Sequence, residues 1–260
     1  MSFNEKFFVE DASPSPCTYA VDTNSNLVLN LDAGNSSSYS GTGTTWNDLS
    51  NNSNNATVVA SNFNPTTATE LGNFGVLSAA NGYPYGSSVT PARPYIAHNT
   101  NLDISPNFSL AIWFRKNGAG GGGLISKRNS GPDYGWGIED TRTNLQFFMY
   151  GSYANYSAYI QKDITAYNNV WTQVVITWST TTLRMYINGV EATTAVTTPT
   201  HSSFPDNNTG PLIIGQKYNT AASPTPAFNG WVQQVKIWQS LLSPSDVTAE
   251  FNKKKACFGL

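Results

Sequence analysis

Carboxylates are the residues of this chain most able to do chemistry, because a pair of them can cleave a glycosidic bond. In retaining glycosidases one carboxylate is the nucleophile and another the acid, about 5–5.5 Å apart. The sixteen acids of this chain are scattered, and the adjacent Glu139 and Asp140 would point to opposite faces of a strand. His98 and His201 have no serine or cysteine motif beside them that would indicate a nucleophile and a base. We therefore expect that the protein is not an enzyme.

A cation site is a second candidate, in the segment "WNDLSNNSNN". Asp48, Asn51 and Asn54 supply side-chain oxygens there, and Asp32, in the strand predicted just upstream, could lie nearby. Calcium takes about six to eight oxygen ligands, so a site with one or two carboxylates would be weak. The same residues would equally well form a loop of Asx turns that binds nothing. Both interpretations stay open, and calcium is the cofactor considered.

Aromatic side chains give the best ligand-binding feature. In "FMYGSYANYSAY" four tyrosines are three residues apart, a spacing that fits neither strand alternation nor a helix through Gly151 and Asn155. Some of these rings should therefore face solvent or a neighbour, as rings that stack on sugars do. The alternative is that they pack loops or form a subunit contact. The predicted carbohydrate site consists of Asp133, Trp136, Tyr153, Asn155 and Tyr156.

Two cysteines, Cys17 and Cys257, lie near the two ends of the chain. If the first and last strands were neighbours, a disulfide between them would close a very long loop, worth about 4–5 kcal/mol in the chain-entropy model. Two free thiols are equally consistent with the sequence.

The composition excludes several classes of partner. A formal net charge of −2 provides no basic surface for nucleic acid. No segment approaches the ~18 consecutive apolar residues that span a membrane. The N-terminal "MSFNEKFFVEDASPSP" has acids where a secretory signal would have an apolar core. We expect a protein that does not insert into membranes and is not exported by the general secretory route.

The elements that must position these residues are strands. In "WTQVVITWSTTTLRMYINGVEATTA" two alternating apolar runs precede Asn188-Gly189, which suits a tight hairpin turn. Ser243, Pro244 and Asp246 predict the start of one short C-terminal helix. The predicted strands cover residues 26–34, 108–114, 124–127, 134–139, 145–150, 171–178, 183–187, 190–192, 212–214 and 231–238. This pattern indicates an all-β antiparallel sandwich.

Five segments in this order resemble laminin-G-like domains of the concanavalin A-like lectin and glucanase superfamily: "FSLAIWFRKNGAGGGGLISKR", "YGWGIED", "WTQVVITWSTTTLRMYINGVE", "LIIGQ" and "FNGWVQQVKIWQSLLSPSDVTAEFN". The resemblance implies a jelly-roll domain over residues 26–260, preceded by an N-terminal arm over residues 1–25. The ending "FNKKKACFGL" is similar to endings of such domains in phage and large-virus structural proteins.

The resulting hypothesis is a non-catalytic, lectin-like decoration protein on the surface of a virus or phage particle, which recognises glycans or a host surface. The arm, residues 1–25, would contact other structural proteins of the particle, and the protein would be oligomeric or present in many copies. The alternatives are a carbohydrate-active enzyme or its binding module, and a purely architectural subunit. A cell-surface or extracellular location reached by a non-classical route is the alternative to the virion.

Overall fold

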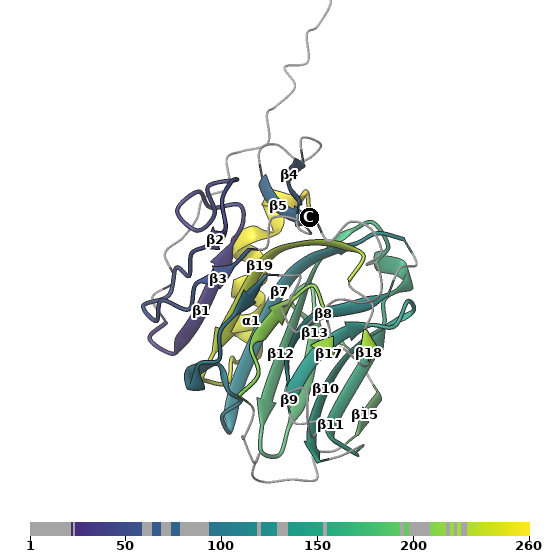
Figure 1. Ribbon diagram of the computed structural model, residues 1–260. Helices are drawn as coiled ribbons and strands as arrows, with labels where there is room; N and C mark the ends of the chain where they lie inside the picture. Colours follow the sequence, from purple (N-terminus) through teal and green to yellow (C-terminus); the bar gives the residue numbers. More distant parts are fainter. Residues whose placement is uncertain are drawn as a thin grey trace, which may run out of the picture.

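Two antiparallel β-sheets face each other in the computed structural model (Figure 1). The structure describes residues 22, 24–58, 64–68, 74–78, 94–118, 121–128, 135–152, 155–192, 195–197, 209–216, 219–220, 223–224 and 228–260. Sheet A contains, in spatial order, β14 (Val190–Glu191), β13 (Leu183–Ile187), β12 (Trp171–Ser179), β7 (Asn107–Lys116), β19 (Gly230–Trp238), β5 (Phe74–Ser78) and β4 (Asn64–Ala68), and β1 (Leu27–Asp32) also pairs with β19. Sheet B contains β15 (Ala195–Thr197), β11 (Asn155–Asp163), β10 (Asn144–Ser152), β9 (Gly135–Asp140), β8 (Gly122–Arg128), β16 (Leu212–Ile214), β6 (Tyr95–Ile96), β3 (Ala56–Thr57) and β2 (Thr45–Trp46). β17 (Asn219–Thr220) and β18 (Ser223–Pro224) form a separate two-stranded sheet. Short 3-10 helices are η2 (Thr100–Leu102), η3 (Thr165–Tyr167) and η4 (Lys255–Phe258).

The core lies between the sheets and consists of alternate residues of their strands. Leu110 and Ile112 of β7 and Phe147 and Met149 of β10 belong to one buried cluster and are 0% exposed. The residues between them point to the outer faces, because successive side chains of a strand alternate. The predicted antiparallel sandwich is therefore confirmed, and each sheet has an outer face that the core does not use.

The β12–β13 hairpin and its return strand form as the sequence predicts. Val174 pairs with Ile187, and Trp178 pairs with Leu183. Asn188 and Gly189 have φ angles of 52° and 79°, the left-handed conformation that a type I′ turn requires.

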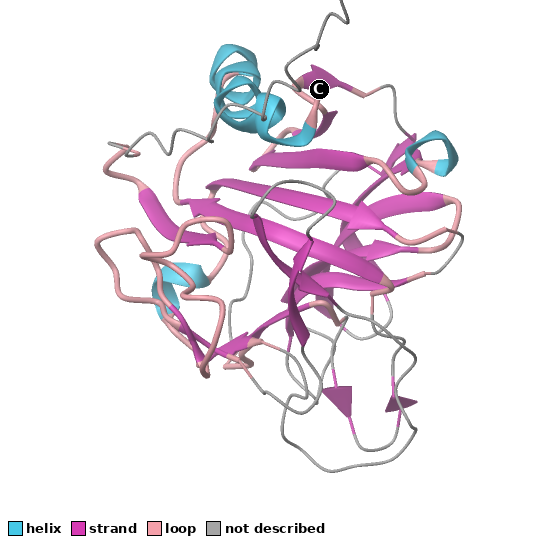
Figure 2. Cartoon of the chain, turned by 90° about the horizontal axis from the view of Figure 1, so that it is seen from above, coloured by secondary structure: helices cyan, strands magenta, loops and turns pink. Residues whose placement is uncertain are grey.

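One α-helix, α1 (Pro244–Lys254), is described, and it covers the outer face of sheet A (Figure 2). Ser243 caps it: its hydroxyl accepts from the backbone N–H of Asp246, whose carboxylate accepts from the backbone N–H of Ser243. Val247 of the helix packs with Val175 and Trp238 of the sheet. The predicted helix and its cap are confirmed.

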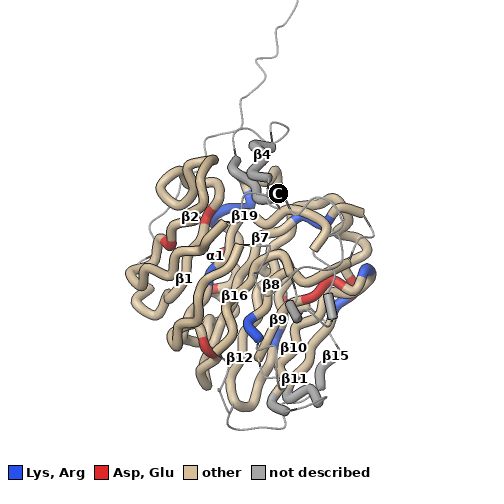
Figure 3. Tube along the Cα trace, in the orientation of Figure 1, with Lys and Arg blue, Asp and Glu red and all other residues tan. Residues whose placement is uncertain are grey.

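Charged residues are few and scattered along the trace (Figure 3). One buried pair joins the sheets: Lys116 Nζ of β7 lies 3.2 Å from Asp140 Oδ2 of β9, and both side chains are 0% exposed. Burial raises the pKa of the Asp140 carboxyl, and the attraction of Lys116 opposes this rise. No helix of the described residues is long and apolar enough to cross a membrane.

The tyrosine-rich segment differs from the prediction, because residues 155–163 form strand β11. The β10–β11 ladder shifts register on both sides of Tyr150, which pairs with Tyr156. These irregularities break the simple alternation on which the prediction relied.

The predicted N-terminal arm lies largely outside the described residues. Asp22 is described, and its carboxylate lies 3.0 Å from Lys236 Nζ of β19. Cys257 lies in η4 and is disulfide-bonded. Cys17, the partner considered for it in the sequence, lies outside the described residues.

Candidate functional site

The outer face of sheet B presents a cluster of polar and aromatic side chains on β8 to β11. Leu145, Phe147 and Met149 of β10 enter the core, so Gln146, Phe148 and Tyr150 point outward. The antiparallel register places outward residues of the neighbouring strands beside them. We call this cluster the β8–β11 face; it consists of Arg128, Glu139, Gln146, Phe148, Tyr150, Tyr159 and Gln161.

The polar part of this face is a row across three strands. Glu139 pairs with Gln146 in the β9–β10 ladder, and Gln146 pairs with Gln161 in the β10–β11 ladder. All three side chains are half-buried. Gln146 Nε2 donates to Glu139 Oε2 over 3.1 Å, which directs its carbonyl oxygen toward β11. There Tyr159 Oη lies 2.8 Å from Gln146 Oε1.

Tyr159 has one hydroxyl proton and lies within reach of two carboxamide oxygens, Gln146 Oε1 and Gln161 Oε1. One proton serves only one of these oxygens at a time. Either the Gln161 carboxamide turns its NH₂ group toward Tyr159 Oη, or one carbonyl oxygen is left for another donor. In the second arrangement the row has a carbonyl oxygen to offer to a ligand hydroxyl.

The aromatic part of the face lies beside this row. Phe148 is 0% exposed and packs against Tyr150, with ring centroids 5.3 Å apart. The Arg128 guanidinium carbon lies 4.4 Å from the Tyr150 centroid. Phe148 lies over Gly137, where an added Cβ would come within 2.7 Å of Phe148 Cζ. Half-buried Tyr150 and Tyr159 thus lie next to hydrogen-bonding groups, a combination that suits both the apolar face and the hydroxyls of a sugar.

The structure does not bring the described residues of the predicted carbohydrate site together at one surface. Trp136 points into the core, is 2% exposed and contacts Phe108 with centroids 5.3 Å apart, so it presents no ring to a ligand at the surface. Asn155 and Tyr156 lie in β11, and Tyr156 is opposite Tyr150. Asp133 and Tyr153 lie outside the described residues.

The acidic pair and the described histidine that the sequence offers as catalytic groups lie in different surroundings. Glu139 lies on the outer face beside Gln146, whereas Asp140 is paired with Lys116 inside the sandwich. The two carboxylates therefore cannot flank one substrate bond. His98 lies 3.3 Å from Lys127 Nζ and 3.9 Å from Asp103 Oδ1, and His201 lies outside the described residues.

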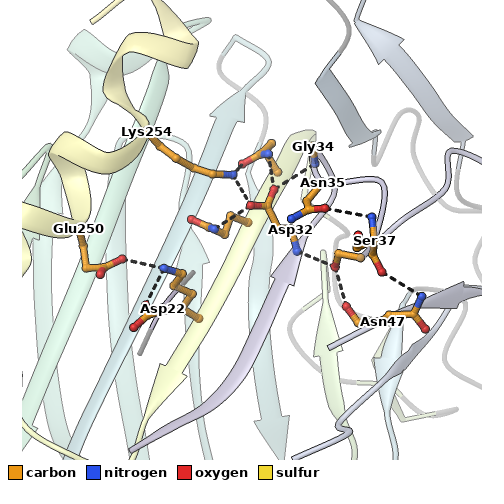
Figure 4. Close-up of polar contacts among 12 residues, drawn as sticks. Asp22, Asp32, Gly34, Asn35, Ser37, Asn47, Glu250 and Lys254 are labelled. Atoms are coloured by element: carbon orange, nitrogen blue, oxygen red, sulfur yellow. Dashed lines mark hydrogen bonds and ion pairs between the residues drawn. The ribbon is translucent and has the colours of Figure 1, made fainter. Parts of the chain in front are cut away.

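Asp32, one of the predicted calcium ligands, is already surrounded by donors (Figure 4). Its Oδ1 accepts from Gln233 Nε2 at 2.7 Å and from the Gly34 N–H at 3.1 Å. Its Oδ2 accepts from Gln234 Nε2 at 3.1 Å and pairs with Lys254 Nζ at 2.6 Å. An ammonium group thus holds the place that a metal ion would need.

The side-chain oxygens of Asp48 and Asn54 also have hydrogen-bond donors. The Asp48 oxygens accept from the backbone N–H groups of Asn30, Ser50 and Asn54 and from the Ser50 hydroxyl. Four donors use the acceptor capacity of a carboxylate. Asn54 Oδ1 accepts from Asn99 Nδ2 over 2.8 Å, and Asn51 is exposed. These residues correspond to the alternative interpretation, an Asx-turn loop.

Sequence reasoning does not single out the residues that make up most of the β8–β11 face. Alternation within the predicted strand at 145–150 is the signal that finds Gln146, Phe148 and Tyr150. Glu139 and Gln161 join them only through pairing between strands, which a single sequence does not specify.

The two antiparallel sheets and the terminal helix define a lectin-type β-sandwich. The family model of the Concanavalin A-like lectin/glucanases superfamily matches residues 90–248, and the chain belongs to this superfamily. No curated protein matches the chain.

Solved structures with the same fold include binding domains of clostridial toxins. The binding domain of Paraclostridial Mosquitocidal Protein 1 matches with a TM-score of 0.61 and 19% identity over 87% of this chain and 52% of that one. Botulinum neurotoxin type C, which depends on two ganglioside molecules to get into cells, matches with a TM-score of 0.60 and 17% identity over 87% and 51%. The botulinum neurotoxin DC binding domain in complex with rat synaptotagmin II matches with a TM-score of 0.58 and 18% identity over 89% and 52%. The chain thus spans about half the length of these structures, and at such identities the likeness shows the fold alone.

Proposed function

We propose that this chain is a non-catalytic glycan-recognition module whose ligand binds on the β8–β11 face. The observation that carries the proposal is the alignment of Glu139, Gln146 and Gln161 across three strands, next to the half-buried rings of Tyr150 and Tyr159. The row offers acceptors and carboxamide donors to sugar hydroxyls, and the rings offer an apolar surface to the sugar C–H groups. The toxin binding domains of the same fold support a role in binding.

The proposal that the module is non-catalytic is supported by the opposite orientations of Glu139 and Asp140. Hydrolysis needs two carboxylates on either side of the bond, and burial with Lys116 removes Asp140 from the outer face. Incubation with a panel of polysaccharides, followed by a reducing-end assay, should show no turnover. Turnover that disappears in the Glu139→Gln variant would contradict this part of the proposal.

A multivalent glycan array tests the binding function directly. The protein is displayed in many copies on beads, because single open sites of this kind bind weakly and avidity amplifies them. Each glutamine hydrogen bond contributes about 0.5–1.5 kcal/mol, so Gln146→Ala and Gln161→Ala should each weaken monovalent binding about 2- to 10-fold and lose most of the multivalent signal.

Arg184→Ala is the matched control, because Arg184 is 47% exposed on β13 of the other sheet. It should bind like the wild type. A wild-type protein that binds no glycan would favour the architectural role. Alanine variants that bind as well as the control would contradict the placement of the ligand on the β8–β11 face.

The location follows as a further part of the proposal: the module is displayed on the outside of a virus or phage particle, attached through residues 1–25. Its support is the resemblance of the ending "FNKKKACFGL" and the need for many copies of a weak site. Immunogold labelling of purified particles should place the protein on their surface. Label restricted to cells or to particle-free medium would contradict this location.

A further inference from the structure

A second aromatic cluster lies on the outer face of sheet A, beneath the C-terminal end of the chain. Trp113 of β7 and Trp171 of β12 are 1% and 4% exposed. Phe258 of η4 contacts both indoles, with centroids 4.5 Å from Trp113 and 4.7 Å from Trp171. The α1 helix adds Phe251, which stacks on Trp113 at 5.6 Å. One ring from the end of the chain therefore covers two tryptophans of the sheet.

Three polar atoms in this cluster have no hydrogen-bond partner. They are Trp113 Nε1, Trp171 Nε1 and Gln173 Oε1, and Gln173 is 1% exposed. Gln173 pairs with Trp113 across the β12–β7 ladder and lies two residues after Trp171, so the three side chains share one face. The cluster thus contains two N–H donors and one carbonyl acceptor, all buried.

Buried polar groups in proteins are nearly always hydrogen bonded, because an unsatisfied group loses its interaction with water and gains nothing in return. Three such atoms lie on neighbouring residues of one face, next to stacked rings. This arrangement is expected of a binding site in which a hydrocarbon ring of the protein takes the place of a polar ligand. The Phe258 side chain fills the space of a ring and satisfies none of the three atoms.

The segment that carries Phe258 is short. Residues Lys255–Leu260 follow α1, and Leu260 is 43% exposed. Cys257 of this segment packs beside the cluster and is disulfide-bonded. The helix itself is held separately, through Val247 and through the Lys254 to Asp32 pair. Rotation of the Phe258 side chain away from the tryptophans therefore requires neither undocking of α1 nor opening of the Cys257 disulfide, which keeps the segment tethered beside the cluster.

We propose that the segment Lys255–Leu260 occludes a second ligand site, formed by Trp113, Trp171 and Gln173, that takes a flat aromatic ring bearing a carboxamide edge. Such a ring replaces the phenyl group of Phe258 against the indoles. Its carbonyl oxygen has two lone pairs for the indole N–H donors, and its N–H group donates to Gln173 Oε1. This site does not depend on the glycan-recognition proposal, because it lies on the other sheet.

Benzamide is the probe that tests this proposal, in the folded full-length chain with Phe258→Ala. The readout is the NMR signals of the two indole N–H groups, which are assigned by the loss of each signal in Trp113→Phe and Trp171→Phe. In Phe258→Ala, benzamide at about millimolar concentration should shift both signals saturably, as expected for a ligand of this size. The wild type should bind at least about tenfold more weakly, because its open state is a minor population.

Three comparisons make the test specific. N,N-dimethylbenzamide, which lacks an N–H donor, should bind Phe258→Ala more weakly than benzamide, and the additional Gln173→Leu substitution should abolish this difference. Leu260→Ala, in the same segment but exposed, should behave like the wild type. If Phe258→Ala does not fold, Phe258→Leu serves instead, because it retains an apolar side chain and removes the ring. Indole signals that benzamide leaves unchanged would overturn the proposal, because the exposed cluster would then take no such ring.

Discussion

Replacing Lys254 by methionine should destabilise the protein by about 3 kcal/mol, because the change leaves the Asp32 carboxylate buried without its cation. The two side chains are 8% and 4% exposed, and Nζ lies 2.6 Å from Oδ2. Breaking a buried pair from one side costs about 3–5 kcal/mol. The amides of Gln233 and Gln234 and the Gly34 N–H still donate to Asp32 in the variant. We therefore expect a loss at the lower end of this range of free energies.

The pH dependence of this loss is a second consequence of the burial. Burial lowers the pKa of Lys254 to about 8, against the opposing attraction of Asp32. In the unfolded chain a lysine has a pKa of about 10.4. Between these values the folded state binds fewer protons than the unfolded state, so Lys254 makes the free energy of unfolding rise with pH. The difference between wild type and Lys254→Met should therefore widen from about pH 8 to 10.

Urea unfolding followed by tryptophan fluorescence measures this difference, provided that both proteins have the same m-value. Replacing both charges, with Asp32→Asn and Lys254→Met together, should recover part of the loss because no uncompensated charge remains. Arg184→Met is the control: its partner Glu191 is 45% exposed, and the change should stay within about 1 kcal/mol. A loss below about 1 kcal/mol in Lys254→Met would refute the reasoning, since the pair would then behave as a surface pair.

Three other substitutions test the local structure by differential scanning calorimetry. Gly189→Ala should cost about 1–2 kcal/mol, since φ is 79° and the new Cβ would lie 3.1 Å from Phe251 Cβ; an unchanged melting temperature would contradict this turn. Ser243→Ala should cost about 1 kcal/mol by removing the cap of α1, and a neutral result would show that the cap is dispensable. Gly137→Ala should cost about 1–3 kcal/mol and weaken glycan binding, because its Cβ would lie 2.7 Å from Phe148 Cζ; retained binding would argue against this position of the ring.

Local signals account for the parts of the fold that the sequence predicts. The alternation of Val174, Ile176 and Trp178 locates β12, and Asn188-Gly189 locates the turn between β13 and β14. Ser243 and Asp246 locate the start of α1 through their mutual capping. These features depend on residues a few positions apart, and their physical causes act within a single segment.

The candidate site depends on non-local register, which is why the sequence does not reveal it. Glu139 and Gln161 are 22 positions apart, and they share a row only because each pairs with Gln146 in the sheet. Tyr150 and Tyr156 are paired across a register shift that no single strand pattern encodes. Alternation does place Trp136 and Ile138 on the same face, and the core position of Ile138 indicates that Trp136 is also buried.

The most direct test of glycan recognition on the β8–β11 face is NMR mapping with a glycan selected on the array. Titration of the isotope-labelled wild-type protein should shift the side-chain amide signals of Gln146 and Gln161, together with ring signals of Tyr159. Signals of Arg184 on the other sheet should stay in place. If the glycan binds while both glutamine amides remain unshifted and signals from sheet A move, the account of this face as the recognition site is contradicted.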